Sequence, residues 1–225
     1  MPGSGLTWEQ KTLLLFIMNI TIPDNTENIN ILISGGADST LLLYLLSKQT
    51  DKPIICHSFH KKSNEVVIPI IDYLEKIFGK RYHYFCLNRK NMILRNAAEL
   101  ILSVYPGVIF TGCNKVVTHF TPTVYIPGDT PPVRGPALNE HHLRPFIEMD
   151  KIDILKLYLE ENILDLLSMT RSCGVPGPGA SRCGGCYFCM ERSWAATELN
   201  INDINNVNIS NYGTINENLQ YFLYI

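Results

Sequence analysis

Strong charge bias and long apolar runs are both missing from this sequence. Its 19 Lys and Arg residues nearly balance its 21 Asp and Glu residues, which gives a formal net charge of −2. Nucleic acid is therefore not indicated as a primary partner. The apolar run at residues 12–18 is too short to cross a membrane and has no basic lead of a signal peptide. We expect a cytoplasmic protein without a membrane partner.

The two commonest phosphate-binding loops are also absent. A Walker loop needs Gly-x4-Gly-Lys-Ser/Thr, and a dinucleotide-binding fold needs Gly-x-Gly-x-x-Gly. Neither pattern occurs in the chain. An internal repeat is not present either, so the chain fits one α/β domain with a small appendage.

One segment does have the features of an anion-binding loop. Residues 34–39 read Ser-Gly-Gly-Ala-Asp-Ser and join an apolar strand pattern to an apolar helix pattern. Adjacent glycines permit positive φ and leave no Cβ in the way, and the following helix adds free amides and its dipole. Asp38 can hold Mg²⁺, which prefers carboxylate oxygen. The pattern predicts a pyrophosphate cradle, with an ordinary helix-capping turn as the alternative. Its members are Ser34, Gly35, Gly36, Ala37, Asp38, Ser39 and Thr40.

Strand and helix patterns alternate along the first half of the chain. This order predicts a doubly wound parallel sheet with right-handed crossovers, in which ligands bind beyond the carboxyl ends of the strands. We expect strands at residues 29–33, 53–59, 81–87 and 108–111, and helices at 7–20, 38–48, 64–78, 91–105 and 150–160.

The second half of the chain is less regular. Six prolines interrupt residues 112–145, which we interpret as a substrate loop. We assign residues 1–165 to an ATP-binding α/β domain and residues 166–225 to a cysteine-rich segment and tail. The apolar end of that tail should pack on the sheet edge or on a second subunit of a homodimer.

Four of the seven cysteines have the spacing of a metal site, C-x9-C-x2-C-x2-C. Zinc needs four ligands at tetrahedral corners, and four thiolates leave no position for an activated water, so we expect a structural Zn²⁺. An iron–sulfur cluster could use the same ligands. The predicted metal ligands are Cys173, Cys183, Cys186 and Cys189, whereas Cys56, Cys86 and Cys113 should pack in the core.

Three segments together resemble one enzyme family. Residues 34–39, 144–151 (Arg-Pro-Phe-Ile-Glu-Met-Asp-Lys) and 170–192, which contains the four cysteines, look like the 7-cyano-7-deazaguanine (preQ0) synthases. These are QueC-type members of the PP-loop N-type ATP pyrophosphatases, with an adenine nucleotide alpha hydrolase-like fold. The resemblance implies catalytic roles for Asp38, Ser39 and Lys151. By position alone, Lys151 would be a solvated residue in the first turn of a helix.

The resemblance also implies a reaction. Such enzymes use ATP to adenylate the carboxylate of 7-carboxy-7-deazaguanine, and they release pyrophosphate and AMP. Ammonia attacks to give an amide, which is then converted to the nitrile. The implied cofactors are ATP, Mg²⁺ and Zn²⁺, and the implied partners are a 7-deazapurine and ammonia. Lys151 would offset negative charge developing at the α-phosphate.

The chain departs from the family after residue 114. The family usually carries an Asp-Tyr pair there, whereas this chain has Lys-Val-Val-Thr-His-Phe at residues 115–120. A related 7-deazapurine substrate, or an amide product, is therefore also open. Two further hypotheses remain. One is a PP-loop tRNA sulfurtransferase whose thiolates hold a metal or an iron–sulfur cluster. The other is a non-catalytic nucleotide-binding module in a larger assembly.

Overall fold

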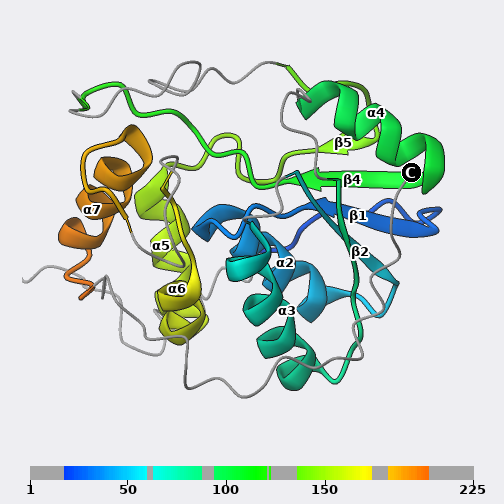
Figure 1. Cartoon of the computed structure of the whole chain (residues 1–225), viewed down its shortest axis with the longest axis horizontal. Helices are drawn as coiled ribbons and strands as arrows, with labels where there is room; N and C mark the ends of the chain where they lie inside the picture. Colours follow the sequence, from blue (N-terminus) through cyan, green and yellow to red (C-terminus); the bar gives the residue numbers. More distant parts are fainter. Residues whose placement is uncertain are drawn as a thin grey trace, which may run out of the picture.

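A sheet of five parallel strands lies between helices above and below it in the view of Figure 1. The computed structural model describes residues 18–59, 63–87, 94–120, 122, 136–173 and 182–202. The strand order is β3-β2-β1-β4-β5, and every neighbouring pair is parallel. The predicted doubly wound parallel sheet is thus confirmed. The strands are β1 (Asn28–Leu32), β2 (Ile54–Ser58), β3 (His83–Cys86), β4 (Gly107–Thr111) and β5 (His142–Leu143).

Helices cover both faces of this sheet. The main core joins one face of β1, including Ile29 and Ile31, to α2, α3, α5 and α6. A smaller core joins the other face, through Leu32 and Ile109, to α4, which lies above the sheet in Figure 1. The helices are α2 (Ala37–Gln49), α3 (Asn64–Phe78), α4 (Leu94–Val104), α5 (Lys151–Glu160), α6 (Leu164–Met169) and α7 (Tyr187–Glu198).

The strand order creates a switch point between β1 and β4. The chain runs from β1 outward to β2 and β3, and then returns to add β4 and β5 on the opposite side of β1. Connections on the two sides diverge there, which leaves a crevice at the carboxyl ends of β1 and β4. The loop at residues 34–39 follows β1 and therefore lies at this crevice.

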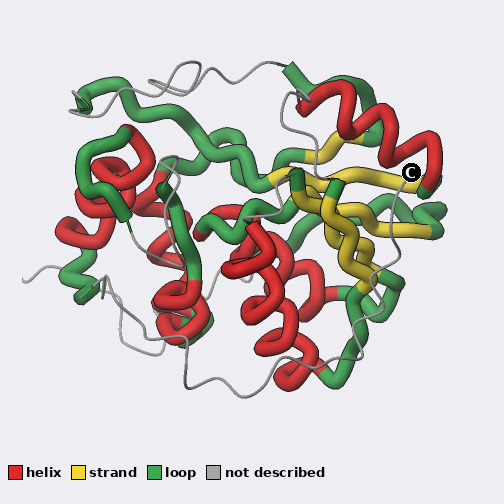
Figure 2. The backbone as a smooth tube through the Cα atoms, in the orientation of Figure 1, coloured by secondary structure: helices red, strands yellow, loops and turns green. Residues whose placement is uncertain are grey.

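Several sequence predictions need correction. The proline-rich stretch contains β5, and residues 114–120 run as an extended segment toward α7 (Figures 1 and 2). Neither α6 nor α7 was expected. The helix predicted at residues 7–20 falls outside the described residues except for 18–20, which are not helical.

The division of the chain at residue 165 stays a prediction. Ala195 and Ala196 of α7 belong to the same core as α2 and α5, so this helix packs directly on the α/β unit. In the part of the chain that the structure describes, none of the helices has the length and apolar character needed to cross a bilayer.

Candidate active site and cysteine centre

A cleft of about 470 Å³ opens at the carboxyl edge of the sheet. It collects residues from the ends of β1, β2 and β4, from the first turn of α5 and from the segment before the cysteine cluster. The cleft therefore lies beyond the carboxyl ends of the strands, where a ligand site is expected in such a sheet. The lining residues are Leu32, Ile33, Ser34, Gly36, Asp38, Ser39, His57, Phe59, Ser63, Thr111, Gly112, Cys113, Lys151, Arg171, Ser172, Cys173 and Phe188.

The turn after β1 requires one of its two glycines for conformation. Gly35 has a φ of +79°, and a Cβ there would lie 2.8 Å from Val66 Cγ1. Any side chain would be strained in this left-handed conformation and would also clash. Gly36 differs from our expectation, because it is an extended N-cap residue with a φ of −77°. The helix begins immediately after it, at Ala37.

Several backbone amides of this loop donate hydrogen bonds to serine hydroxyl oxygens. Ser39 Oγ accepts from the Ser34 amide at 3.2 Å and donates to the Gly36 carbonyl at 3.2 Å. The Ala37 amide donates to Ser172 Oγ at 3.4 Å. An anion bound here would compete with these hydroxyl oxygens for the same donors.

The predicted loop residues do not all reach the cleft. Ser34, Gly36, Asp38 and Ser39 line it. Gly35, Ala37 and Thr40 do not appear among its lining residues, and Thr40 is fully buried with no partner for its Oγ1 among the described residues. The nucleotide-binding roles of all seven residues stay predictions.

The turn after β4 lies very close to the start of α2 at the carboxyl edge of the sheet. A Cβ on Gly112 would lie 2.7 Å from the Ser39 amide nitrogen, so only glycine allows the turn after β4 to meet the start of α2. Cys113 is half-buried and lines the cleft rather than packing in the core, which corrects our prediction. Cys56 is fully buried in the core, and Cys86 packs against its edge, as predicted.

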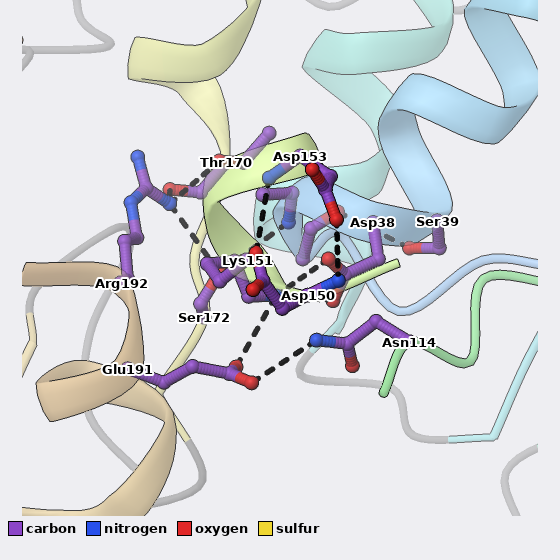
Figure 3. Close-up of polar contacts among 12 residues, drawn as sticks. Asp38, Ser39, Asn114, Asp150, Lys151, Asp153, Thr170, Ser172, Glu191 and Arg192 are labelled. Atoms are coloured by element: carbon purple, nitrogen blue, oxygen red, sulfur yellow. Dashed lines mark hydrogen bonds and ion pairs between the residues drawn. The ribbon is translucent and has the colours of Figure 1, made fainter. Parts of the chain in front are cut away.

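Two cationic side chains, Lys151 and Arg171, line the cleft, and Lys151 is the one paired with Asp38 (Figure 3). Asp150 caps α5 by accepting from the Ile152 and Asp153 amides, and this fixes Lys151 in the first turn. The Lys151 side chain is buried, and its Nζ lies 2.5 and 2.6 Å from the two carboxylate oxygens of Asp38. The interpretation of Lys151 as a solvated first-turn residue is therefore wrong.

The two carboxylates near Lys151 keep its side chain protonated. Burial by itself would lower the pKa of Lys151, but the carboxylates of Asp38 and Glu191 outweigh it and raise that pKa above 10.5. The ammonium group is therefore positively charged at neutral pH. It lies at the loop edge where phosphate charge would accumulate.

Glu191 and Arg192 of α7 support this site, and the sequence analysis missed both. Glu191 Oε2 lies 3.4 Å from Lys151 Nζ, and Glu191 Oε1 accepts from Asn114 Nδ2 at 3.0 Å. Arg192 donates to the Thr170 hydroxyl at 2.7 Å and to the Leu167 carbonyl at 3.0 Å. The available signal was an adjacent Glu-Arg pair that begins two residues after Cys189, because buried charges in a helix are normally paired.

His57 forms part of the cleft wall and is neutral. Its Nε2 lies 3.1 Å from Asn30 Oδ1, whereas Asn30 Nδ2 donates to the carbonyls of Tyr105 and Val108. The Asn30 oxygen thus faces the ring, and Nε2 must carry the proton. Burial lowers the pKa of His57 to about 3. Nδ1 has no partner among the residues that the structure describes.

The four predicted metal ligands do come together. Their sulfur atoms all lie within 4.8 Å of one another, and those of Cys183 and Cys189 are 3.9 Å apart. A tetrahedral ion with bonds of about 2.3 Å places its sulfur ligands roughly 3.8 Å apart. The cluster therefore fits a single ion. Although burial raises it, hydrogen bonds from the Cys186 and Gly185 amides lower the pKa of Cys183 to about 7.

The cysteine centre borders the cleft. Cys173 and Phe188 both line it. Just before Cys173, the Arg171 amide donates to the Gly35 carbonyl at 2.8 Å. The segment that carries the first ligand is thus bonded directly to the turn after β1.

Fold and site together define a doubly wound parallel α/β protein with a cleft at its switch point and a four-cysteine centre beside it. No protein-family model matches the chain, and no curated protein matches it. Three solved structures resemble this chain at low similarity. The U34-tRNA thiolase NcsA from Methanococcus maripaludis, with its [4Fe-4S] cluster, is 14% identical with a TM-score of 0.44, covering 80% of this chain and 68% of that chain.

The other two structures are synthetases. The NH3-dependent NAD synthetase from Campylobacter jejuni subsp. jejuni is 14% identical with a TM-score of 0.44, covering 72% of this chain and 77% of that chain. The NMN synthetase from Francisella tularensis is 10% identical with a TM-score of 0.42, covering 81% and 89%. Such low similarity assigns no substrate to this chain.

Proposed function

We propose that this protein is an ATP-dependent enzyme that transfers AMP to an acceptor oxygen and releases pyrophosphate. The observation that carries the proposal is the buried Lys151 ammonium, held against Asp38 at the edge of the loop and helix start. A solvated capping turn would not need a buried cation facing it. A site for several phosphates does, because their negative charge must be offset in the transition state.

Each group has a role that follows from its position. Amides of the 34–39 loop and the start of α2 would hold the leaving pyrophosphate once its oxygens replace the hydroxyl acceptors. The ammonium of Lys151 would face the phosphate that is transferred. Asp38 is partly exposed in the cleft and could turn to Mg²⁺, which would neutralise phosphate charge when bound.

For the acceptor, we propose the carboxylate of 7-carboxy-7-deazaguanine or of a related 7-deazapurine, with ammonia as the nucleophile. The three family-like segments support this substrate class, because all three contribute to the cleft or its cysteine border. A cleft of about 470 Å³ falls within the usual range for small-molecule sites. The product would be 7-cyano-7-deazaguanine or the amide.

The departure after residue 114 favours a related base over the family's own one. In this chain the Lys115 amide donates to the Met149 carbonyl, and the Val117 amide donates to the Tyr187 hydroxyl at 2.9 Å. This segment packs against α7. The Asp-Tyr pair that the family places here therefore has no direct counterpart.

The test is an assay of AMP formation from ATP, with 7-carboxy-7-deazaguanine, ammonia and Mg²⁺. We expect AMP and pyrophosphate in equal amounts, and the amide or nitrile by mass spectrometry. Reactions without the acid or without ammonia are the controls. ATP binding without AMP formation for any deazapurine acid would favour the non-catalytic module.

For the cysteine centre, we propose a structural Zn²⁺, because the close sulfur atoms suit one ion and all four ligands would be cysteine thiolates. A tRNA sulfurtransferase remains the second candidate function. One observation favours it, namely that Cys113 and Cys173 both line the cleft where a transferred sulfur would have to arrive. Metal analysis separates the two. Colourless zinc supports the synthase, whereas iron with acid-labile sulfide supports sulfur transfer.

A further inference from the structure

Lys151 has two carboxylate partners that are not equivalent. Asp38 lines the cleft and its side chain is 21% exposed, whereas the Glu191 side chain is 2% exposed and does not line the cleft. A ligand in the cleft can therefore reach Asp38 but not Glu191. Figure 3 shows the ammonium lying between the two acids.

Several hydrogen bonds also hold the Glu191 carboxylate in place. One oxygen accepts from Asn114 Nδ2 at 3.0 Å, and the Tyr187 hydroxyl lies 3.4 Å from the same oxygen. The next residue, Arg192, is buried and bonds the Thr170 hydroxyl and carbonyl. These bonds fix α7 on the segment that leads to Cys173, and so they fix the Glu191 carboxylate.

The two observations have one electrostatic consequence. With both acids, the buried group carries one positive and two negative charges. If Asp38 turns away to a divalent cation, Lys151 and Glu191 remain as a balanced buried pair. Without Glu191, the same movement would leave a buried ammonium with no counter-ion, which is strongly unfavourable.

We propose that Glu191 is a positioning residue, which serves as the permanent counter-ion of Lys151 and thereby frees Asp38 to bind the divalent cation that accompanies ATP. This inference rests on the proposed function in one respect, that Asp38 exchanges Lys151 for that cation. Glu191 itself touches neither nucleotide nor metal. It acts through Lys151.

The first experiment measures the Mg²⁺ requirement of nucleotide binding. A non-hydrolysable ATP analogue is titrated into the protein by calorimetry over a series of Mg²⁺ concentrations. In E191Q, Asp38 becomes the sole counter-ion of Lys151, so we expect half-maximal binding to need about tenfold more Mg²⁺, as is typical of coupling within one buried network. Binding of the analogue without Mg²⁺ should change little. An unchanged Mg²⁺ requirement would overturn the inference.

Two variants serve as comparisons. Glu198 is exposed on the same helix, and E198Q makes the same chemical change away from Lys151, so its Mg²⁺ requirement should match the wild type. E191D keeps the charge with a shorter reach and should require less Mg²⁺ than E191Q. An E191D protein no better than E191Q would mean that packing rather than charge matters, and would contradict the role.

The second experiment needs no nucleotide. Unfolding of D38N, E191Q and the double variant is compared with the wild type in a double-mutant cycle. Each single change leaves Lys151 one carboxylate, whereas the double change leaves none. The double variant should therefore lose more stability than the sum of the two single variants.

The outcomes distinguish this inference from the proposed function. If the losses of stability in D38N and E191Q are additive, the two acids do not share Lys151 and the inference fails. This holds whether or not the AMP assay detects activity. A wild-type protein that binds no ATP analogue would overturn the proposed function. A more than additive loss would then still establish Glu191 as the second counter-ion.

Discussion

At the residue scale, Lys151 is the residue on which the proposal of a catalytic cleft rests. Its side chain is almost fully buried, yet two acids hold its charge. Such an arrangement contributes little net stability compared with an apolar core, because desolvation of three charged groups opposes their attraction. Folding stability alone therefore does not account for a buried triad of this kind, which is why we propose a chemical role for it.

We predict that Lys151→Met strongly slows AMP formation and also destabilises the protein. Methionine fills a similar volume but leaves Glu191 buried without a cation, and losing one partner of a buried pair costs about 3 kcal/mol or more. Loss of the ammonium should slow turnover by roughly a factor of 100 to 1,000. Denaturant unfolding and the AMP assay measure the two effects.

Lys156→Met is the matched control for this change. Lys156 lies on the same helix, is 62% exposed and forms only a loose pair with Glu160 at 3.8 Å. Its replacement should leave both unfolding and turnover nearly unchanged. Equal effects of the two substitutions would argue against the Lys151 site.

His57 gives the fold a dependence on pH. The folded state keeps this ring neutral down to about pH 3, whereas an unfolded histidine takes up a proton near pH 6.5. Between those values the unfolded state binds more protons, so stability is present above pH 6.5 and is lost as the pH falls toward 3. The slope from one such group reaches about 1.4 kcal/mol per pH unit.

We expect His57→Gln to flatten the dependence of the unfolding free energy on pH between about pH 6 and 4. The control is His83→Gln, which removes an exposed histidine from the neighbouring strand β3. Because both variants keep the cysteine centre, its own loss at low pH cancels in the comparison. A slope that His57→Gln leaves unaltered would show that His57 is charged in the fold.

Sequence patterns predicted the single residues of the site unevenly. The loop at 34–39 and the four cysteines were found because their chemistry is local, with fixed spacing and a glycine turn. Glu191 was missed because its partner lies on a different element, 40 positions earlier in the chain. Charge pairs of such long range leave no periodic signal.

At the element scale, α7 connects the two centres. It begins at Tyr187, directly after Cys186, carries Cys189 on its first turn, and then presents Glu191 and Arg192 to the α/β unit. A zinc ion bound to these cysteines would supply the folding free energy that a twelve-residue helix lacks on its own.

We predict that Cys186→Ser loses the metal, lowers the melting temperature and reduces helix content. Serine is a poor zinc ligand, and structural zinc can contribute on the order of 10 kcal/mol to folding. Atomic absorption gives the zinc content, and circular dichroism gives the melting curve. Cys86→Ser is the control, since Cys86 is half-buried outside the cluster and should leave zinc stoichiometric.

Helices were predicted correctly where the spacing of apolar residues was clearly helical. The predicted helix at 64–78 matches α3 at both ends, since an apolar stripe and Gly79 define it. The helices α6 and α7 were missed for a physical reason. One is a single short turn and a half, and the other has no apolar stripe because metal ligands and buried charged residues replace it.

At the scale of the whole molecule, the cleft depends on contacts between distant parts of the chain. Asp38 and Lys151 are separated by 113 positions, and Ala37 and Ser172 by 135. The parallel sheet predicted from the sequence implies that loops meet at its carboxyl edge. It does not imply that α7 lies beside the cleft, because the position of α7 depends on packing against helices such as α5 and not on the sheet.

If a metal and a nucleotide bind as proposed, these long-range contacts would couple the two binding events thermodynamically. Cys173 follows Arg171 and Ser172, whose amide and hydroxyl bond the turn after β1 at Gly35 and Ala37. Zinc bound at Cys173 would therefore restrain the segment that shapes the proposed phosphate-binding loop, although no thiolate needs to touch ATP. Linkage requires the effect to be reciprocal.

We predict that chelating the metal weakens binding of an ATP analogue by about tenfold, a coupling of roughly 1.4 kcal/mol. Calorimetry on zinc-loaded and stripped protein, at a temperature where circular dichroism shows the sheet still folded, measures it. Zinc affinity should rise by the same factor when the analogue is present. The Cys86→Ser protein, treated with the same chelator, should behave as the wild type does. Equal analogue affinity with and without zinc would mean that the cysteine centre only stabilises its own segment and does not shape the loop at residues 34–39.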